Sequence, residues 1–327
     1  MKKYFAFVLA VVMAFSLMAC GNTAANDTNG DENTNQTVEY PTKTIEIICP
    51  FSTGGDTDAL ARALANEMTN ELGVSVMVTN MTGGGGSVAS TYVKDAQPDG
   101  YTVYWCHNTL VVNDICDISD YNHDAFEPAA LCAQSSALCV WTNSQFNDLD
   151  ELVAYAKENP GKLNVGMVQG GITEIMAIAF CNAVGIEVNY VDCGSGNDMN
   201  VEMVAGRVSM CVNTFGTVSE YYNSGDLKPL AVMGEERLGK CADVPTMKEL
   251  GYEVVGDMYY GFYFPKGTDE AVIDAFNAAA KVAAESPSYL ETLESYGYNP
   301  VFITKDDAKA TMDNILTYYE QFKDLMA

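Results

Sequence analysis

The sequence has few positive charges and few of the side chains that hold metal ions. Its 327 residues include 17 Lys and Arg against 44 Asp and Glu, which gives a formal net charge of −27, and only two His. Binding a polyanion requires a positive surface, so this balance argues against nucleic acid as a partner. No Cys-x-x-Cys pair occurs, and we therefore expect neither a zinc site nor a thioredoxin-like redox motif.

Signatures of catalysis and of nucleotide binding are equally scarce. No G-x-G-x-x-G or G-x-x-x-x-G-K-S/T spacing occurs in the glycine-rich loops. Neither Ser52 nor Ser195 lies in a G-x-S-x-G context, and His107 and His123 lie in separate polar segments. Neighbouring carboxylates arise by chance when 44 acidic residues are present, so they indicate nothing alone. We therefore expect no catalytic residue, no metal and no cofactor.

The N-terminal segment has the features of a lipoprotein signal. Two lysines precede an apolar run over residues 4–19 that ends in L-M-A-C, too short and wrongly flanked for a permanent membrane span. We predict a signal peptide over residues 1–19 and lipidation of Cys20, which would hold an exported protein at the membrane through its lipid alone. The alternative is an ordinary signal with a chance cysteine. Residues 20–40 are rich in Asn, Thr, Asp and Gly, which predicts a flexible tether.

Nine cysteines remain when Cys20 is set aside. An odd number cannot all pair within one chain, although export would otherwise favour disulfides. Several lie in apolar, strand-like runs such as IEIICPF and VSMCVNT, where cysteine acts as a small buried hydrophobic side chain. We therefore expect free thiols in the core.

From residue 41 onward, short β-branched runs alternate with amphipathic segments, which is typical of α/β proteins. We expect strands at 44–49, 74–79, 101–106, 137–141, 164–168, 187–191, 208–213, 228–233 and 259–264. We expect helices over 58–72, up to Lys94, before the N-P-G at 159–161, up to Val184, and over 269–285 and 305–326.

Two similar halves followed by a helical stretch predict two lobes joined by crossings near 140–145 and 258–264. Lobe 1 would contain residues 41–143 and 259–327, and lobe 2 residues 144–258. In open α/β sheets a ligand binds at loops that follow the carboxyl ends of strands. We therefore expect a ligand cleft between the lobes.

Three glycine-bearing loops each follow a predicted strand and precede a helix: S-T-G-G-D-T-D (52–58), T-G-G-G-G-S (82–87) and Q-G-G-I-T (169–173). Glycine permits positive φ and close approach to a ligand, and the helix behind it offers unpaired N–H groups to an anion. An ordinary turn with a helix cap at Asp58 or Thr173 explains each loop as well. Two loops at equivalent places in two lobes would, however, face each other when the lobes close.

The run YPTKTIEIICPFSTGGDTDALARALANEMTNELGVSVMVTNMTGGGGSVAS resembles the opening of the tripartite tricarboxylate transporter receptors, the Bug family of extracytoplasmic solute receptors. The likeness continues in order through A-Q-P-D-G-Y-T (96–102), N-V-G (164–166), G-x-V-S-M (206–210), D-V-P-T-M-K-E-L-G (243–251) and P-K-G-T (265–268). The resemblance implies a two-lobed α/β fold of the type II periplasmic-binding-protein class. It also implies lobe closure on a ligand and its delivery to integral-membrane permease subunits.

In the family that the sequence resembles, backbone amides and ordered water from two facing loops hold the ligand. The ligand-binding residues that we predict on this basis, together with positions that follow strands, are Phe51, Ser52, Thr53, Gly54, Gly55, Asp58, Asn108, Thr109, Val168, Gln169, Gly170, Gly171, Thr173, Asp192, Asn213 and Thr214.

The second loop departs from the family pattern. It reads G-M-V-Q-G-G-I-T-E-I, whereas the usual form resembles G-S-x-G-x-G-S-x-x-H, and Asn213-Thr214 follow a strand where an Asp is usual. Fewer hydroxyls and no histidine predict a more apolar contact from lobe 2. The nearest cations in sequence are Arg62 and Arg207, and Asp56 adds a negative charge beside the first loop.

We therefore predict a monomeric receptor for a small organic acid or an amino-acid-like solute. The few cations near the loops also allow a zwitterionic or weakly charged ligand. One alternative is a ligand-sensing surface lipoprotein without a role in transport. The other is an enzyme on the same fold, for which the loops offer only Asp56, Glu174 and His107 as titratable groups.

Overall fold

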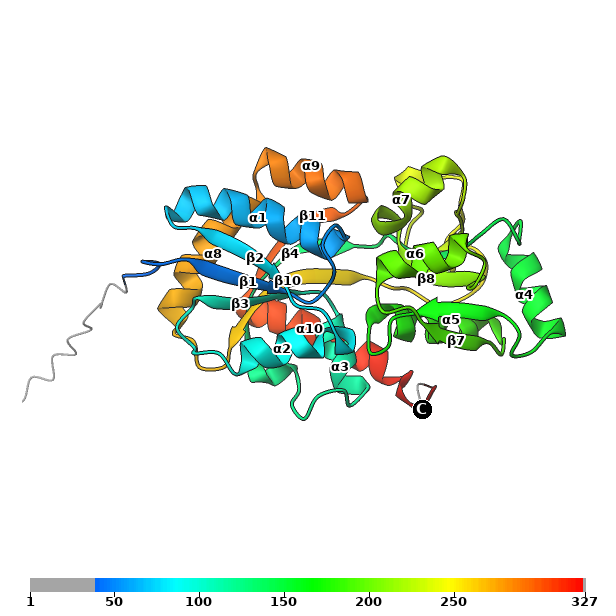
Figure 1. Ribbon diagram of the computed structural model, residues 1–327, viewed down its shortest axis with the longest axis horizontal. Helices are drawn as coiled ribbons and strands as arrows, with labels where there is room; N and C mark the ends of the chain where they lie inside the picture. The colour runs from blue at the N-terminus through cyan, green and yellow to red at the C-terminus, as the bar shows by residue number, and fades with distance from the viewer. Residues whose placement is uncertain (1–38, 326–327) are drawn as a thin grey trace, which may run out of the picture. The chain divides into compact units, whose positions relative to one another are not determined.

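The computed structural model describes residues 39–325, and this part of the chain forms two β-sheets (Figure 1). The first sheet has the strand order β11 (Asn299–Thr304), β4 (Phe126–Ser135), β10 (Met258–Pro265), β3 (Thr102–Cys106), β1 (Ile45–Cys49) and β2 (Val76–Asn80). The second has the order β7 (Asn189–Asp192), β6 (Asn164–Met167), β8 (Met210–Thr214), β5 (Leu138–Thr142) and β9 (Lys228–Val232). Both sheets are mixed, because parallel strands at one side meet antiparallel partners at the other.

Figure 1 shows that each sheet is covered by its own set of helices. Those of the first lobe are α1 (Asp56–Leu72), α2 (Ser87–Lys94), α3 (Thr109–Ile115), α8 (Glu270–Ala284), α9 (Pro287–Tyr296) and α10 (Lys305–Glu320). Those of the second are α4 (Leu149–Glu158), α5 (Ile172–Val184), α6 (Gly196–Val204) and α7 (Phe215–Ser224). Short 3-10 turns lie at η1 (Gly84–Gly86), η2 (His123–Ala125), η3 (Gly239–Cys241) and η4 (Lys323–Leu325).

The two tryptophans of the chain anchor one lobe each, and both are fully buried. The indole N–H of Trp105 in β3 donates to the carbonyl of Thr57 at 2.9 Å, at the start of α1. The indole N–H of Trp141 in β5 donates to the carbonyl of Asn213 at 3.0 Å, at the end of β8. A buried indole needs a hydrogen-bond acceptor, so each ring fixes the backbone of a segment that faces the other lobe.

The chain crosses between the sheets twice, and the first crossing differs from the prediction. β4 ends at Ser135 in the first sheet, whereas β5 begins at Leu138 in the second. The crossing expected at 140–145, and with it the lobe boundary after residue 143, is therefore one strand too late. All of β5 is buried, and a run that is apolar on both faces carries no signal of the sheet that it joins.

The second crossing precedes β10, close to where the sequence predicts it. The N–H of Gly256 still donates to Met233 at 2.7 Å, beyond the end of β9, whereas Met258 already begins β10. The two crossings touch each other, because the hydroxyl of Ser136 donates to the carboxylate of Asp257 at 2.6 Å.

Most predicted elements are present, and six further elements are not predicted: β4, β11, α3, α6, α7 and α9. The two missed strands each contain a proline, Pro128 in β4 and Pro300 in β11. A proline within a run of residues makes that run a poor candidate for a strand when only the sequence is known. Pro128 lies opposite Tyr263 next to a register shift in the β4–β10 ladder, where an irregular strand accommodates the missing N–H.

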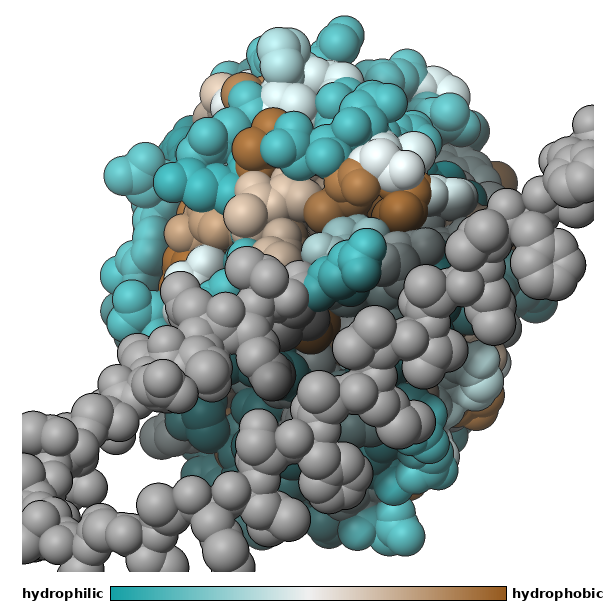
Figure 2. Space-filling view, turned by 90° about the vertical axis from the view of Figure 1, so that its left-hand side faces the viewer, coloured by the Kyte–Doolittle hydropathy of each residue, from teal (hydrophilic) through white to brown (hydrophobic). Residues whose placement is uncertain are grey.

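The predicted signal peptide, the lipidation of Cys20 and nearly all of the tether lie outside the described residues. The last tether residue, Tyr40, contacts the first lobe, since its hydroxyl donates to the carbonyl of Gly100 at 2.7 Å. Across residues 39–325, no helix combines the length and apolarity needed to cross a membrane. Figure 2 shows a mainly hydrophilic face around a small hydrophobic area at the end of the first lobe.

Candidate ligand-binding site

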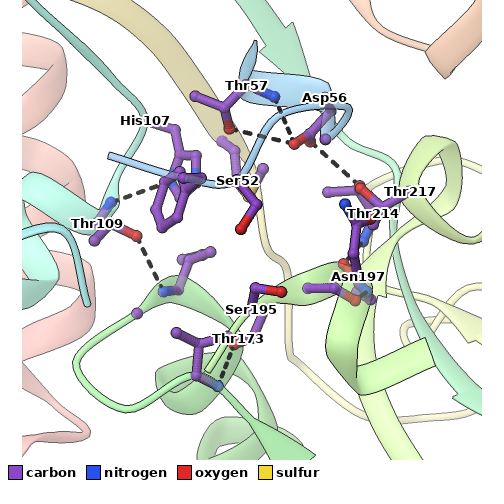
Figure 3. Close-up of a pocket in the computed structure, with 18 of the residues that line it drawn as sticks. Ser52, Asp56, Thr57, His107, Thr109, Thr173, Ser195, Asn197, Thr214 and Thr217 are labelled. Carbon is purple, nitrogen blue, oxygen red and sulfur yellow. Dashed lines mark hydrogen bonds between the residues drawn. The ribbon is translucent and has the colours of Figure 1, made fainter. Parts of the chain in front are cut away.

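A small cavity of about 70 Å³ lies between the lobes, where four helices begin (Figure 3). The first turns of α1, α5, α6 and α7 all contribute to its wall. The lining residues are Phe51, Ser52, Gly55, Asp56, Thr57, His107, Thr109, Leu138, Val168, Gly171, Ile172, Thr173, Ser195, Gly196, Asn197, Asn213, Thr214, Thr217 and Met258. Helix N-termini present unpaired N–H groups, so their convergence brings hydrogen-bond donors into a largely apolar wall.

The first loop follows β1 and turns into α1 at Gly55. Gly54 has a φ of +88°, a conformation that favours glycine, and its N–H donates to the carboxylate of Asp58 at 3.0 Å. Asp58 is buried and also accepts hydrogen bonds from Arg62 and Asn80. Burial opposes its charge, but these three donors outweigh burial and hold the pKa of Asp58 below its usual value.

Of the predicted first-loop residues, Phe51, Ser52 and Gly55 line the cavity, whereas Thr53, Gly54 and Asp58 do not. The hydroxyl of exposed Thr53 donates to Asn80 at 3.1 Å. Gly54 and Asp58 bond each other, and Thr53 and Asp58 both bond Asn80, so these residues shape the loop while their neighbours line the cavity.

The second loop, which follows β6, repeats this construction. Gly170 has a φ of +71°, and its N–H donates to the carboxylate of Glu174 at 2.6 Å, four residues on, just as Gly54 donates to Asp58. In both loops the second glycine is the extended residue that precedes the helix. The sequences G-G-D-T-D (54–58) and G-G-I-T-E (170–174) therefore build the same turn.

Val168, Gly171 and Thr173 line the cavity, whereas Gln169 and Asp192 lie at its mouth. The N–H of Gln169 donates to the Asp192 carboxylate at 3.2 Å. Both residues line an adjoining hollow of about 400 Å³, which also contacts the glycine segment 83–86 and shares Phe51, Ser52, Val168 and Ser195 with the cavity. Gly170 lines neither space; its carbonyl accepts a hydrogen bond from the side chain of Asn113 at 2.7 Å.

Asp56 is the only residue with an acidic side chain among those that line the cavity, and none of them is Lys or Arg. One carboxylate oxygen accepts from the hydroxyls of Tyr260 at 2.7 Å and Tyr298 at 2.5 Å, and from Thr214 of the second lobe at 3.3 Å. The other accepts from the N–H of Thr57 at 2.7 Å. The chain therefore holds the Asp56 carboxylate rigidly with neutral donors.

His107 and Phe51 form an aromatic wall of the cavity. Their rings stack with centroids 4.9 Å apart, and the edge of His107 meets Tyr260. Burial lowers the pKa of His107 to about 4, although the nearby Asp56 charge opposes this shift. The ring is therefore neutral at neutral pH. Its Nδ1 accepts from the N–H of Thr109 at 3.3 Å, which leaves Nε2 as the donor.

Asn108, a predicted ligand residue, lies outside the cavity. It is fully buried, and its side-chain amide donates to the Asp257 carbonyl and to the Tyr319 hydroxyl at 2.7 and 3.0 Å. Its oxygen accepts from the N–H of Tyr259 at 2.9 Å. Asn108 thus fixes the second crossing, whereas the next residue, Thr109, lines the cavity and accepts from the N–H of Ile172 across the lobes at 3.3 Å.

Asn213 and Thr214 both line the cavity at the end of β8. The side chain of Asn213 donates to the carbonyl of Gly196 at 3.0 Å, which ties β8 to the start of α6. Thr214 connects with Thr217 at 2.9 Å as well as with Asp56.

Several cavity residues are absent from the prediction: Asp56, Thr57, His107, Leu138, Ile172, Ser195, Gly196, Asn197, Thr217 and Met258. A signal existed for α6, because Ser195-Gly-Asn-Asp198 follows a strand and has the spacing of a capping box. The Ser195 hydroxyl accepts from the N–H of Asp198 at 3.1 Å. No such signal exists for Leu138 and Met258, which only the two crossings bring to the cavity.

The second lobe contributes free backbone N–H donors to the cavity. Within residues 39–325, no acceptor bonds the N–H groups of Thr173, Gly196 or Asn197, which lie in the first turns of α5 and α6. The corresponding N–H of α1, that of Thr57, is already bonded to Asp56. The nearest cations that the sequence offers are engaged elsewhere, Arg62 with Asp58 and Arg207 with Glu202.

Comparison with known proteins identifies the family to which this chain is similar. The model of the tripartite tricarboxylate transporter family receptors matches residues 60–320. A Cupriavidus necator protein, "UPF0065 protein in gbd 5'region", is 30% identical over 277 residues, which are 82% of this chain and 83% of that protein.

Two solved structures are similar throughout the described lobes. The periplasmic binding protein BugD has a TM-score of 0.78 at 25% identity, covering 88% of this chain and 97% of BugD. MatC of Rhodopseudomonas palustris, with bound malate, has a TM-score of 0.78 at 24% identity, covering 88% of this chain and all of that one. These likenesses confirm the predicted two-lobed α/β fold.

Proposed function

Because the chain belongs to the tripartite tricarboxylate transporter receptors, as the sequence predicts, we propose that it captures a small solute outside the cytoplasm and delivers it to membrane permease subunits. Its relatives are solute-binding receptors and not enzymes, so the enzyme alternative is set aside. The observation that carries the proposal is the cavity between the lobes, walled by helix N-termini from both. The predicted lipid on Cys20 would keep the receptor beside its permease.

Binding would proceed by closure of the lobes on the solute. Three hydrogen bonds join the lobes around the cavity: Thr214 to Asp56, Ile172 to Thr109, and Asn113 to the carbonyl of Gly170. Each of these bonds requires the lobes to lie close together. A solute that contacts both lobes stabilises the closed state by its differential affinity for it.

A carboxylate on the solute would bind at the second lobe. The free N–H groups of Thr173, Gly196 and Asn197 supply three donors at two helix N-termini, the usual site for an anion. The structure of MatC with bound malate is a precedent for a carboxylate ligand in this fold. Phe51, Leu138, Ile172 and Met258 would contact the apolar part of the solute.

The test uses the exported chain, purified from its producing cells and released from bound solute by denaturation. We expect mass spectrometry to identify a small carboxylate, and that compound to raise the melting temperature of the refolded protein. We also expect small-angle scattering to show a smaller radius of gyration with the compound. A protein that yields no compound, and whose melting temperature no small carboxylate or amino acid changes, would refute the proposal.

A substitution tests the amide donors directly. Gly196→Pro removes the first N–H of α6 at a position where proline fits a helix, since the preceding Ser195 is extended. We expect the affinity for the solute to fall by about 10- to 100-fold, the value of a hydrogen bond to a charged group. Gly196→Ala keeps the N–H and is the matched control. Equal affinity of the two variants would show that this amide does not bind the solute.

The remaining alternative, sensing without transport, shares the cavity. Reconstituted vesicles with the permease subunits would distinguish the two: receptor-dependent uptake of the identified solute supports delivery, whereas its absence favours a sensor.

A further inference from the structure

Acidic residues, and neither Lys nor Arg, line the cavity and its mouth. Asp56 lines the cavity itself, Asp192 lines its mouth, and Glu174 and Asp198 lie in the first turns of α5 and α6. Arg62, the nearest cation in sequence to the first loop, is paired with Asp58. The helix N-termini offset part of this charge through their partial positive charge, but no full positive charge lines the cavity.

Asp56 is not needed to form the loop that carries it. The second loop forms the same turn with Ile172 at the corresponding position, since the glycines and the carboxylate four residues after Gly54 or Gly170 define the turn. A carboxylate at Asp56 therefore has a role beyond local structure. Tyr260 and Tyr298 hold it in place, and it remains a lining group of the cavity.

The free amides and Asp56 lie at different parts of the cavity wall. Figure 3 shows Asp56 beside Thr57 at the top and Thr173 at the bottom of the same space, with Asn197 at the side between them. A ligand that spans the cavity from the amides would bring its other end towards Asp56. A second carboxylate there would meet a fixed like charge without a cation to offset it.

We propose that the solute is a zwitterion, a small amino carboxylate without a second acidic group, whose ammonium faces Asp56 and whose carboxylate binds the amides of α5 and α6. This inference rests on the proposed receptor function and specifies its substrate class. The ammonium supplies the positive charge that none of the residues lining the cavity provides. The small volume of about 70 Å³ and the apolar contacts of Ile172 and Leu138 select a short, uncharged side chain.

Matched ligand series test the proposal on the mature chain freed of bound solute. Each neutral amino acid is compared with the acid that has a hydroxyl or a hydrogen in place of its amino group, for example alanine with lactate and propionate. Aspartate, malate and succinate form the acidic series. Melting temperature ranks the compounds, and calorimetry measures the affinity of those that raise it.

We expect a neutral amino acid to bind at least about tenfold more tightly than its hydroxy and deaminated analogues. In Asp56→Asn this preference should fall to within about threefold, because the attraction for the ammonium is lost. Asp306→Asn is the control: it removes an exposed carboxylate from the first turn of α10 and should keep the preference. Circular dichroism and urea unfolding verify that each variant folds.

Three results would overturn the inference. One is equal or tighter binding of a hydroxy acid or a dicarboxylate, which would leave the receptor function intact. Another is an unchanged preference in folded Asp56→Asn. The third is the absence of any response from both series, which would refute the receptor function as well. The comparison of ligands on the unsubstituted protein decides the question even if Asp56→Asn does not fold.

Discussion

The loops at 54–58 and 170–174 have the same backbone and opposite electrostatics. In each, a glycine with positive φ donates its N–H to a carboxylate four residues on, and a second, extended glycine precedes the helix. The first helical residue is Asp56 in one loop and Ile172 in the other. The Asp56 carboxylate accepts a hydrogen bond from the N–H of Thr57, whereas the equivalent N–H of Thr173 is not hydrogen-bonded. A single side chain thus makes one helix N-terminus an anionic wall and leaves the other able to bind an anion.

The largest expected effect comes from making the second loop like the first. In Ile172→Asp the introduced carboxylate would bond the N–H of Thr173, as Asp56 bonds that of Thr57, and would repel the solute's carboxylate. We expect calorimetry to show an affinity about 1,000-fold lower, or 4 kcal/mol, in a folded but less stable variant, because Ile172 is buried in the core. Ile172→Asn, which is neutral and of similar shape, should retain far more affinity. Equal losses in the two variants would contradict the electrostatic explanation.

The aromatic wall of the first loop predicts a pH dependence that the second loop lacks. The pKa of His107 is about 4 in the folded protein and 6.5 ordinarily, so the folded state binds fewer protons between these values. The contribution of neutral His107 to the free energy of unfolding is therefore fully present above about pH 6.5. It amounts to about 3 kcal/mol and is lost as the pH falls through 4.

His107→Phe keeps the stacking on Phe51 without a titrating group. Urea unfolding across pH 4–7 should show a shallower acid loss in this variant than in the unsubstituted protein. Parallel curves would show that His107 does not cause the dependence.

The two capping carboxylates should respond to pH in opposite directions. The pKa of Asp58 is depressed, so its contribution to stability is present at neutral pH and is lost as the pH falls through the folded value. Burial raises the pKa of Glu174 despite the N–H of Gly170, so its unfavourable contribution at neutral pH is relieved as the pH falls.

At neutral pH we expect Asp58→Asn to cost about 2 kcal/mol in urea unfolding, because Arg62 loses its ion pair, and Glu174→Gln to cost less. At lower pH, the loss in free energy of unfolding caused by Asp58→Asn should be smaller, because Asp58 of the unsubstituted protein becomes protonated. A constant difference between these variants at every pH would contradict the assigned shifts.

The smallest effects come from the glycines that the two turns share. Gly54→Ala would add a Cβ with nothing within 4 Å, so only the positive φ should count, at about 1 kcal/mol. Gly170→Ala would in addition approach Ile118 at 3.1 Å and should cost a few tenths of a kcal/mol more. Thermal unfolding of both variants measures the difference. A smaller loss of stability in Gly170→Ala than in Gly54→Ala would show that the second loop adapts more easily to a side chain.

Much of the fold follows from local patterns in the sequence. The alternation of β-branched runs and amphipathic segments predicts most strands and helices, and the motif order predicts the family that the comparison confirms. The missed strands β4 and β11 contain prolines, whose tolerance depends on the register of a neighbouring strand. The early crossing before β5 depends on which sheet a fully buried strand joins, and hydrophobicity alone does not specify this.

The two glycine turns follow from local sequence, because positive φ and a carboxylate four residues on are requirements that five consecutive residues satisfy. Which polar groups face the ligand cavity depends instead on how distant parts of the chain pack together. Asn108 and Thr109 are neighbours in the chain, yet one fixes a crossing and the other lines the cavity. Asp56 enters the cavity because Tyr260, Tyr298 and Thr214, all more than 150 residues away, converge on its carboxylate. Such convergence depends on the packing of both lobes, and no local pattern specifies it.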